Sequence, residues 1–268
     1  AAGAIGSPAV LLRSALPDPH GLVGRRTFLH PTVVSAAVMP DPVKGYEGAP
    51  QTIYSDHFLD SLPVDGPMGF KLEAPPLHPI LAGITLPGFG AAHAGWMKSF
   101  ANLQVVIALL RDGFHPESPG GRVVLREDGS PVLDYPLGAF LWDGVRRAYL
   151  TMAEIQFAAG ARTVLPLHED AGPAATWAQA REAIAELPMA PLHARVVSAH
   201  VMGGCPMGPE PRTAVVDERG RHHHVANLSV HDGSLFPTSI GANPQLSIYA
   251  IAARMADALA AELARRPS

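Results

Sequence analysis

The feature that most constrains this chain is a series of short motifs near its C-terminus. They read Ser-Ala-His-Val-Met-Gly-Gly-Cys-Pro-Met-Gly at 198–208, Val-Val-Asp at 215–217, Asn-Leu-Ser-Val-His-Asp-Gly-Ser at 227–234 and Gly-Ala-Asn-Pro-Gln-Leu-Ser-Ile at 241–248. The apolar run 225–230 predicts a strand that places Asp232 and Gly233 at its carboxyl end. Asn243 and Pro244 predict the start of a helix. A strand, an acidic turn and a helix N-terminus together suit a ligand that carries phosphate and a polar ring.

The order and density of these motifs resemble the C-terminal signature of the glucose–methanol–choline (GMC) family of flavin-dependent alcohol oxidoreductases. In that family a His-x-x-Gly-x-Cys block precedes an Asn-Leu-x-Val-x-Asp-Gly/Ala-Ser strand and an Asn-Pro helix start. The doubled glycine at 203–204 is closer to the sterol and fatty-alcohol oxidase branch than to the choline or glucose branch. A second signature of the family occupies residues 3–14, although Ala-Leu-Pro follows where the family has Gly-aliphatic-Gly.

The position of the second signature shapes the expected domain organisation. In the family it lies about midway along the chain, after an ADP-binding strand, Gly-x-Gly-x-x-Gly loop and helix. The nearest such string here, residues 88–93, has histidine in place of the third glycine. The resemblance therefore implies the C-terminal half of a flavoenzyme, with the ADP-binding part on a separate N-terminal chain or fragment. We expect FAD-domain segments at 1–31 and 195–268 and a substrate-binding domain at 32–194.

The predicted fold class is α+β or α/β, with part of a flavin-binding domain and a substrate domain whose mainly antiparallel sheet is flanked by helices. β-branched and apolar runs separated by Pro- and Gly-rich turns predict the strands, and their short connections favour antiparallel pairing. These strands are 32–39, 51–58, 68–77, a hairpin of 123–125 and 132–135 around Glu-Asp-Gly-Ser, and 163–167.

Helices are predicted where apolar residues recur at spacings of three and four. The first, 7–14, has Ser7 as N-cap and Pro8 at its first position. Gly160 closes the longest pattern as a C′ residue. The other predicted helices are 96–111, 140–159 and 177–187.

Composition excludes several functional classes. The 268 residues, of which 47% are hydrophobic, suffice for the core of one large domain or two modest ones. The formal net charge of -4 gives no reason to expect a nucleic-acid partner. Because no apolar run approaches the ~18 residues of a membrane span, we expect a soluble protein of the cytoplasm or periplasm. Cys205 is the single cysteine, so an internal disulfide is impossible.

Two residues are candidates for the chemistry that the resemblance implies. Oxidising an alcohol requires a base for the hydroxyl proton, and an imidazole with a pKa near neutrality can serve. By resemblance, His200 and Asn243 fill the paired His/Asn positions on the substrate side of the flavin, where Asn243 donates to the substrate oxygen. Taken alone, a histidine is more often a hydrogen-bonded interior residue, and Asn243 before Pro244 suits a helix N-cap. The place of His200 within its motif favours the catalytic reading.

The same motifs supply the residues expected to hold FAD. Gly233 allows close approach of the cofactor, and Asp232 is expected to accept from a ribityl hydroxyl or from backbone amides. The amides at the helix start are expected to face the pyrimidine ring. The cofactor-binding residues are thus Asp232, Gly233, Asn243, Pro244, Gln245 and Leu246.

The resemblance implies FAD-dependent oxidation of a small-molecule alcohol, of lipophilic character, to a carbonyl, with O2 or another electron acceptor. A cyanohydrin lyase of the same family and a non-catalytic flavin- or metal-binding subunit are the alternatives. Three consecutive histidines at 222–224, with His231 and His200, offer imidazoles for a metal. Adjacent residues of an extended segment point to opposite faces, so these three cannot converge on one tetrahedral ion, and no metal is assigned.

Overall fold

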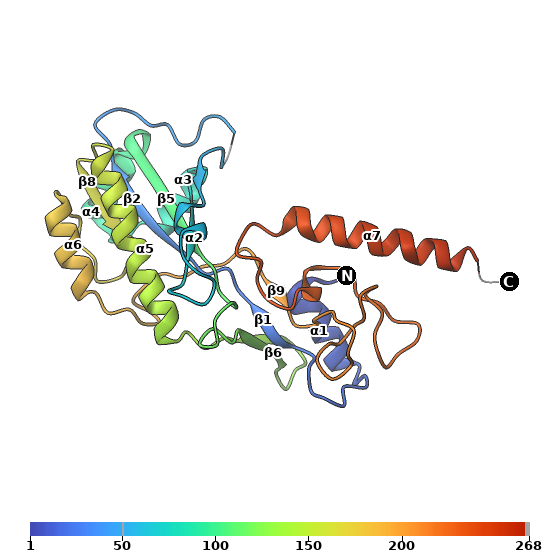
Figure 1. Cartoon of the computed structure of the whole chain (residues 1–268). Coiled ribbons are helices and arrows are strands. Elements are labelled where there is room, and N and C mark those ends of the chain that lie inside the picture. The colour runs from blue at the N-terminus through green and yellow to red at the C-terminus, as the bar shows by residue number, and fades with distance from the viewer. Residues whose placement is uncertain (50, 266–268) are drawn as a thin grey trace. The chain divides into compact units, whose positions relative to one another are not determined.

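The computed structural model describes residues 1–49 and 51–265. It divides the chain into two compact units, which are considered separately below (Figure 1). The first unit comprises Ala1–His30, Asp112–Pro136 and Ser198–Ser268, and the second comprises Pro31–Arg111 and Leu137–Val197. In the described part of the chain, no helix has the length and apolar character needed to cross a membrane.

The second unit is built on an antiparallel sheet in the order β3-β4-β5-β2-β8. The antiparallel arrangement predicted for this region is therefore confirmed. The strands are β2 (Thr32–Val38), β3 (Tyr54–Ser55), β4 (Phe70–Glu73), β5 (Leu103–Leu110) and β8 (Thr163–Pro166).

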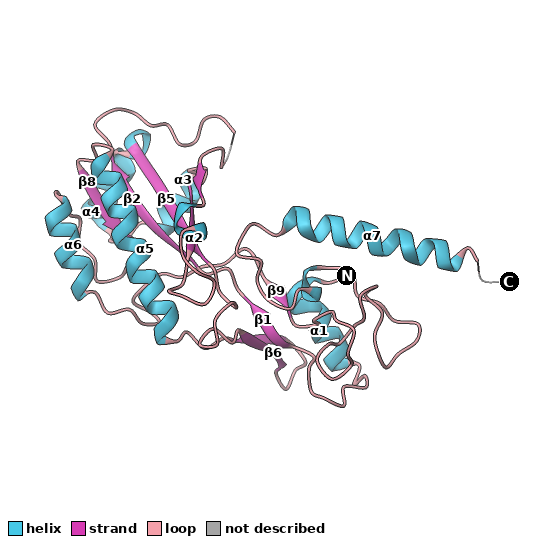
Figure 2. Cartoon of the chain, viewed as in Figure 1, coloured by secondary structure: helices cyan, strands magenta, loops and turns pink. Residues whose placement is uncertain are grey.

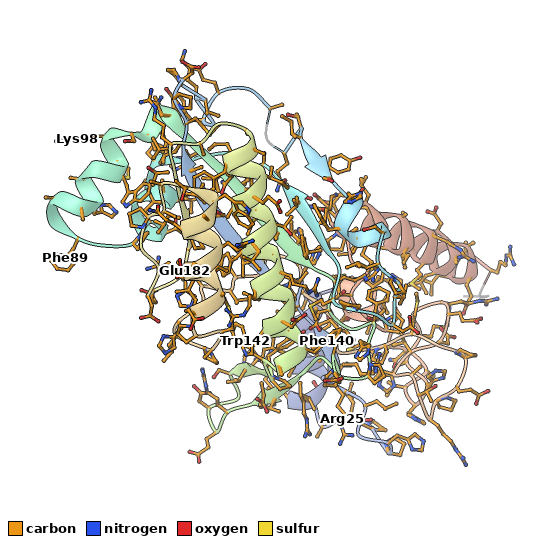
Figure 3. The ribbon with its side chains drawn as sticks, turned by 60° about the vertical axis from the view of Figure 1, so that its left-hand side comes forward. Arg25, Phe89, Lys98, Phe140, Trp142 and Glu182 are labelled. Atoms are coloured by element: carbon orange, nitrogen blue, oxygen red, sulfur yellow. The ribbon has the colours of Figure 1, made fainter. Side chains whose placement is uncertain are left out.

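Helices pack on both faces of this sheet (Figure 2). One face packs against α5 (Ala139–Ala158) and α6 (Trp177–Glu186), and Phe140 and Trp142 at the start of α5 pack partly buried against this core (Figure 3). The other face packs against α3 (Pro79–Thr85) and α4 (Gly90–Lys98). The short α2 (His57–Asp60) and a 3-10 turn, Phe100–Asn102, connect the strands.

The alternation of side chains along β2 explains why both faces are covered. Val33 and Ala37 are fully buried in the core on the α5 side, whereas Val34 and Ala36 pack on the α3 side. Because successive residues of a strand point to opposite faces, an apolar strand in the middle of a sheet needs helices on both sides. The apolar run at 32–39 therefore implies a strand buried on both faces.

The predicted helix at 96–111 is wrong in its greater part. Its first residues complete α4, but Leu103–Leu110 is β5, which pairs along most of its length with β2 and, over its last four residues, with β4. The segment Leu-Gln-Val-Val-Ile-Ala-Leu-Leu is apolar almost throughout, and such a run satisfies the helical and the strand spacing equally. Burial on both faces between two neighbouring strands decides in favour of the strand.

The first unit contains a second antiparallel sheet in the order β7-β6-β1-β9. Its helices are α1 (Gly3–Arg13), a 3-10 turn at Gly233–Leu235 and α7 (Gln245–Leu263). The strands are β1 (Arg25–Phe28), β6 (Gly121–Leu125), β7 (Pro131–Asp134) and β9 (Met202–Gly203).

The predicted domain boundaries need one correction. The β6–β7 hairpin lies within the expected substrate-binding segment 32–194, but Asp112–Pro136 belongs to the first unit. The reason is that β6 pairs with β1, with Arg25 opposite Arg122 and Thr27 opposite Gly121. A pairing between segments so far apart in the chain leaves no local pattern in the sequence.

Four further predicted elements differ from the structure. α1 begins at Gly3 rather than after Ser7, so Pro8 lies inside it. Residues 225–230 form no strand in the described chain beyond the isolated bridge of Ser229 to Arg221. The strands predicted at 51–58 and 68–77 shrink to β3 and β4. Where an element forms, pairing and packing with other parts of the chain set its ends.

Candidate active site

The C-terminal motifs meet at Gly233 in the first unit. The amide of Cys205 donates to the carbonyl oxygen of Ser234 at 2.9 Å, so the 198–208 motif runs beside the acidic turn. A Cβ added at Gly233 would lie 3.1 Å from Cδ1 of Ile248 on α7 and 3.5 Å from the carbonyl oxygen of Val201. Motifs separated in sequence are therefore neighbours in space, and a side chain larger than hydrogen at 233 would press against Ile248.

Asp232 holds the start of α1 against this turn. Its Oδ2 accepts from the amides of Ala2 at 2.9 Å and Gly3 at 3.2 Å and from the hydroxyl of Ser7 at 2.5 Å, and its Oδ1 accepts from the amide of Ser234 at 2.8 Å. Burial alone would raise the pKa of Asp232, but these hydrogen bonds outweigh burial and the pKa lies below its ordinary value. The sequence predicts that Asp232 accepts from a ribityl hydroxyl or from backbone amides, and its described contacts are with backbone amides and the hydroxyl of Ser7.

The doubled glycine is required by backbone packing. Gly203 and Gly204 have φ values of 83° and 97°, a region that other residues rarely adopt. A Cβ at Gly203 would collide with the carbonyl oxygen of Arg26 on β1. At Gly204 it would lie 2.8 Å from Oγ1 of Thr27 and 3.0 Å from Cγ of Pro8. The two glycines thus let the segment that follows His200 lie tightly against β1 and α1.

His200 is half-buried and contacts a second histidine. Its Nδ1 lies 3.0 Å from Nδ1 of His30, which is fully buried. Ser198 connects the backbones of the pair, because its hydroxyl accepts from the amide of His30 at 3.1 Å and donates to the carbonyl oxygen of His200 at 3.3 Å. Two Nδ1 atoms at this distance share one proton, so the tautomer of one imidazole fixes that of the other.

Asn243 lies half-buried, two residues before α7 begins at Gln245. The helix expected to start at Pro244 therefore begins one residue later, and Pro244 rather than Asn243 occupies the cap position. The side-chain nitrogen of Gln245 donates to the hydroxyl of Tyr249 at 2.7 Å. Leu246 is 80% exposed. The side chains of Gln245 and Leu246 do not pack in the core. Their backbone amides are therefore the groups that matter for binding at the helix start.

This donor set fits the FAD that the resemblance implies. The first amides of an α-helix have no partner within the helix and carry the positive end of its dipole. Those of Gln245 and Leu246 suit the carbonyl oxygens of a flavin ring, and Gly233 has no side chain that would obstruct a cofactor. Asp232, by contrast, already accepts four hydrogen bonds from this chain. Its contribution to such a site is to fix the turn.

Cys205 is not a candidate nucleophile. It is fully buried, and burial raises its pKa to about 12, so the thiolate is absent at neutral pH. The prediction of a small buried residue is therefore confirmed.

The neighbouring histidines have local partners. Burial lowers the pKa of His222, whose Nδ1 accepts from the amide of His224 at 3.1 Å. Nε2 of His223 lies 3.1 Å from the carbonyl oxygen of Gly208. Within residues 1–49 and 51–265, no group of three or more His, Cys, Asp or Glu side chains is arranged to hold a metal ion.

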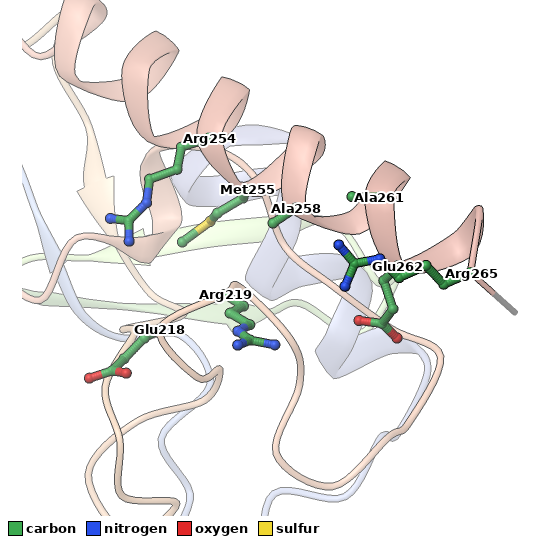
Figure 4. Close-up of a pocket in the computed structure, with 8 residues that line it drawn as sticks. All are labelled: Glu218, Arg219, Arg254, Met255, Ala258, Ala261, Glu262 and Arg265. Atoms are coloured by element: carbon green, nitrogen blue, oxygen red, sulfur yellow. The ribbon is translucent and has the colours of Figure 1, made fainter.

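A cavity of about 430 Å³ lies elsewhere in the first unit, beside α7. Figure 4 shows Arg254, Met255 and Glu262 projecting from α7 toward the turn that carries Glu218 and Arg219. Positive and negative side chains alternate around it, and Glu262 is ion-paired with the nearby Arg221. This cavity shares no residue with the motifs at 198–208 and 241–248, so its volume does not make it the active site.

His30 is the site residue that the sequence patterns do not single out. It stands in a Phe-Leu-His-Pro segment that resembles the family crossing from the flavin domain to the substrate domain, which assigns it no role. Its partner His200 lies 170 positions away. No periodicity or spacing connects residues at that separation, so the pair is visible only in the folded chain.

Known proteins are similar to this chain along nearly its whole length. The sequence profile of the GMC oxidoreductase family matches residues 116–252. An uncharacterized GMC-type oxidoreductase of Sinorhizobium fredii is 26% identical over 262 residues, which cover 96% of this chain and 48% of that protein. A long-chain-alcohol oxidase of Arabidopsis thaliana is 28% identical over 268 residues, covering 94% and 35%. The chain thus spans about half the length of these curated relatives, or less.

Among solved structures, formate oxidase of Aspergillus oryzae superposes with a TM-score of 0.66 at 15% identity, over 97% of this chain and 53% of that one. At so low an identity this likeness shows the fold alone. The profile match over more than half of the chain, and relatives of the same class along nearly its whole length, show that this chain belongs to the GMC oxidoreductase family.

Proposed function

We propose that the complete protein of which this chain is part oxidises an alcohol to a carbonyl with FAD, and that His200 accepts the hydroxyl proton. The observation that carries the proposal is the contact of 3.0 Å between Nδ1 of His200 and Nδ1 of His30. When a neutral His200 donates from Nδ1, its Nε2 keeps the lone pair. That is the tautomer a general base requires.

The other groups of the site support the same chemistry. FAD, when bound, accepts the hydride that leaves the alcohol carbon. As the proton leaves the hydroxyl group, negative charge develops on the oxygen, and the side-chain amide of Asn243 is proposed to donate to it. The amides of Gln245 and Leu246 are proposed to hold the cofactor, and Asp232 and Gly233 to shape the turn beneath it, with Pro244 directing the start of α7.

Family membership supports the proposed substrate class and partners. A relative named long-chain-alcohol oxidase covers nearly the whole of this chain, and it supports a lipophilic alcohol as the substrate. Its name also supports O2 as electron acceptor, although another acceptor would meet the same requirement. An N-terminal part of the protein, or a separate chain, is proposed to bind the ADP portion of FAD.

The proposal is tested in the complete flavin-loaded protein by following bleaching of the flavin band under anaerobic conditions. A primary alcohol is expected to bleach the band. His200→Ala is expected to slow bleaching by roughly the 10²–10⁴ typical of a lost general base. The matched control is His224→Ala, which removes an exposed imidazole of the same unit and is expected to leave the rate unchanged.

The outcomes also separate the rival activities. Bleaching at an unchanged rate in His200→Ala removes His200 from the mechanism. Cleavage of a cyanohydrin without bleaching identifies a lyase, and a flavin that responds to neither compound identifies a non-catalytic subunit.

A further inference from the structure

The loop at residues 236–244, between the 3-10 turn and α7, contains Asn243 and has no regular secondary structure. It follows Leu235, whose carbonyl oxygen accepts from the amide of Met207 at 2.9 Å, and it ends where α7 begins at Gln245. The whole loop belongs to the first unit. Because such a loop has no repeating hydrogen bonds of its own, contacts with other parts of the chain fix where Asn243 lies.

Two consecutive hydroxyl groups of this loop bond to two consecutive carbonyl groups elsewhere in the unit. Oγ1 of Thr238 donates to the carbonyl oxygen of Gly113 at 2.7 Å, and Oγ of Ser239 donates to the carbonyl oxygen of Asp112 at 2.5 Å. The partners are 125 and 127 positions apart in the chain. Ser239 is fully buried, so no water can replace its acceptor. We call these two bonds the 238–239 clasp.

The segment that accepts these bonds is itself held in place. The hydroxyl of Ser118 accepts from the amide of Gly113 at 2.7 Å and donates to the side chain of Asp112. Gly113 has a φ of 89°, and a Cβ there would collide with Oγ1 of Thr238 and lie 2.7 Å from Cδ1 of Phe28. A side chain at 113 would therefore push the two segments apart. The acceptors of the 238–239 clasp thus have a fixed backbone conformation.

A neighbouring contact ties the same loop to β1. The guanidinium group of Arg26 donates to the carbonyl oxygen of Pro237 from Nε at 3.2 Å and from Nη2 at 3.1 Å. Three successive residues, 237–239, are therefore bonded to segments far away in the sequence. Ser239 precedes Asn243 by four positions, which span at most about 13 Å of extended chain. A displacement at Ser239 would reach Asn243 with little chain to absorb it.

We propose that Thr238 and Ser239 are positioning residues, whose hydroxyls hold the side chain of Asn243 and the first amides of α7 in a fixed place within the unit. The consequence for alcohol oxidation rests on the proposed function. The anchoring itself rests only on the two hydrogen bonds, the burial of Ser239 and the close approach at Gly113. A catalytic group displaced by about 1 Å can lose roughly 10² in rate, so loss of the 238–239 clasp is expected to lower kcat more than it changes KM.

The first test compares variants of Thr238 in the complete flavin-loaded protein. Thr238→Val removes the hydroxyl at nearly constant size, and Thr238→Ser keeps it. The matched control is Thr213→Val in the same unit, because Thr213 is exposed and its hydroxyl donates to the carbonyl oxygen of Glu210, three positions away. Thr238→Val is expected to slow anaerobic reduction of the flavin by a primary alcohol roughly 10- to 100-fold. Thr238→Ser is expected to restore most of the rate, and Thr213→Val to leave it unchanged.

A double-variant cycle shows whether the 238–239 clasp acts through Asn243. If it does, Thr238→Val slows flavin reduction in the wild-type background and has little further effect once Asn243→Ala is present. Equal fold-changes in the two backgrounds overturn the proposal, because the hydroxyl then affects the rate by another route. A rate that is unchanged when Thr238→Val and Ser239→Ala are combined also overturns it.

Hydrogen exchange of the complete protein tests the anchoring without turnover. Peptides covering residues 240–248 are expected to exchange faster in Thr238→Val than in the wild type or Thr238→Ser, whereas peptides of β6 are expected to keep their rates. Unchanged exchange at 240–248, or equally faster exchange in β6, overturns the anchoring. If no alcohol reduces the flavin of the wild type while Thr238→Val still loosens 240–248 alone, the proposed function fails and the anchoring stands. Equal flavin reduction and equal exchange in wild type and Thr238→Val show the reverse.

Discussion

At the scale of single residues, the His30–His200 contact makes a prediction that needs no turnover. Nδ1 of His30 lies 3.0 Å from Nδ1 of His200, and we predict that it accepts this hydrogen bond, which would keep the proton of neutral His200 off Nε2. His30→Leu removes the acceptor and is expected to move the proton of neutral His200 to Nε2 in a substantial fraction of molecules. The side-chain 15N shifts of His200, assigned with His200→Gln, report that change.

The conservative variant makes this a test of positioning rather than of folding. In His30→Asn, the amide oxygen lies near the place of Nδ1 and can still accept. It is expected to restore the original tautomer of His200 and to keep faster flavin reduction than His30→Leu. The same tautomer in all three proteins would show that His30 serves packing alone.

Asp112 predicts a pH dependence of stability. Burial raises its pKa to about 6, although a backbone hydrogen bond from Gly113 acts in the opposite direction, and the hydroxyl of Ser118 also donates to it. The folded-state pKa lies above the unfolded value of 3.8, so the folded protein favours protonated Asp112. The contribution of Asp112 to the free energy of unfolding is therefore complete below pH 3.8 and is lost as pH rises through 6. A shift of this size corresponds to about 3 kcal/mol at pH 7.

The measurement compares denaturant unfolding of the wild type and Asp112→Asn at pH 5 and pH 7.5. The variant is expected to gain stability relative to the wild type as pH rises, because its amide never ionises. A difference between the two proteins that does not vary with pH would contradict the assignment.

At the scale of elements, a buried polar network joins α5 to the sheet. Gln156 is 1% exposed, and its side-chain oxygen accepts from the hydroxyl of Ser35 on β2 at 2.6 Å. Its nitrogen donates to the side-chain oxygen of Gln104 on β5 at 2.8 Å and to the carbonyl oxygen of Ser35 at 3.2 Å. The network fixes which turn of α5 lies over which pair of strands.

Gln156→Leu leaves the hydroxyl of Ser35 buried without its acceptor. We expect a loss of about 1–3 kcal/mol in the free energy of unfolding, measured by chemical denaturation. Combining it with Ser35→Ala removes both partners and is expected to recover part of that loss. Strictly additive losses in the double variant would show that the two side chains are not coupled.

Some helices and strands can be predicted from local sequence patterns alone. α5 and the β6–β7 hairpin occur where spacing and turn residues place them, and Gly160, with φ of 92°, follows the last residues of α5 as expected. These features depend on neighbours within a few positions. The spacing does not predict β5, because an almost continuous apolar run fits either period and only its strand partners decide.

At the scale of the whole molecule, α7 buries little of its surface within the described chain. It has 19 residues, of which Met255 is buried, while Leu246, Tyr249 and Leu263 are more than half exposed. The chain spans 48% or less of the length of the curated relatives compared above. An amphipathic helix stabilised by tertiary packing is expected to have its remaining contacts elsewhere in the complete protein.

Hydrogen exchange of the complete protein with and without FAD tests this view together with the proposed site. FAD is expected to slow exchange of the amides at the start of α7 and in Gly233–Leu235, because these lie where the cofactor is proposed to bind. The central strands of the second unit, β2 and β5, are the internal control and are expected to change little. Protection confined to those strands would place the cofactor elsewhere.

What the sequence determines by itself is information held in contiguous residues. The order of the C-terminal motifs leads to the family and to His200 and Asn243, and local spacing leads to α5, α6 and β2. Only the tertiary structure brings His30 to His200 across 170 positions, Asp232 to the start of α1 across 229 and 230, and the β6–β7 hairpin to β1. The physical reason is that such contacts depend on the three-dimensional path of the chain between them, and no short-range pattern records that path.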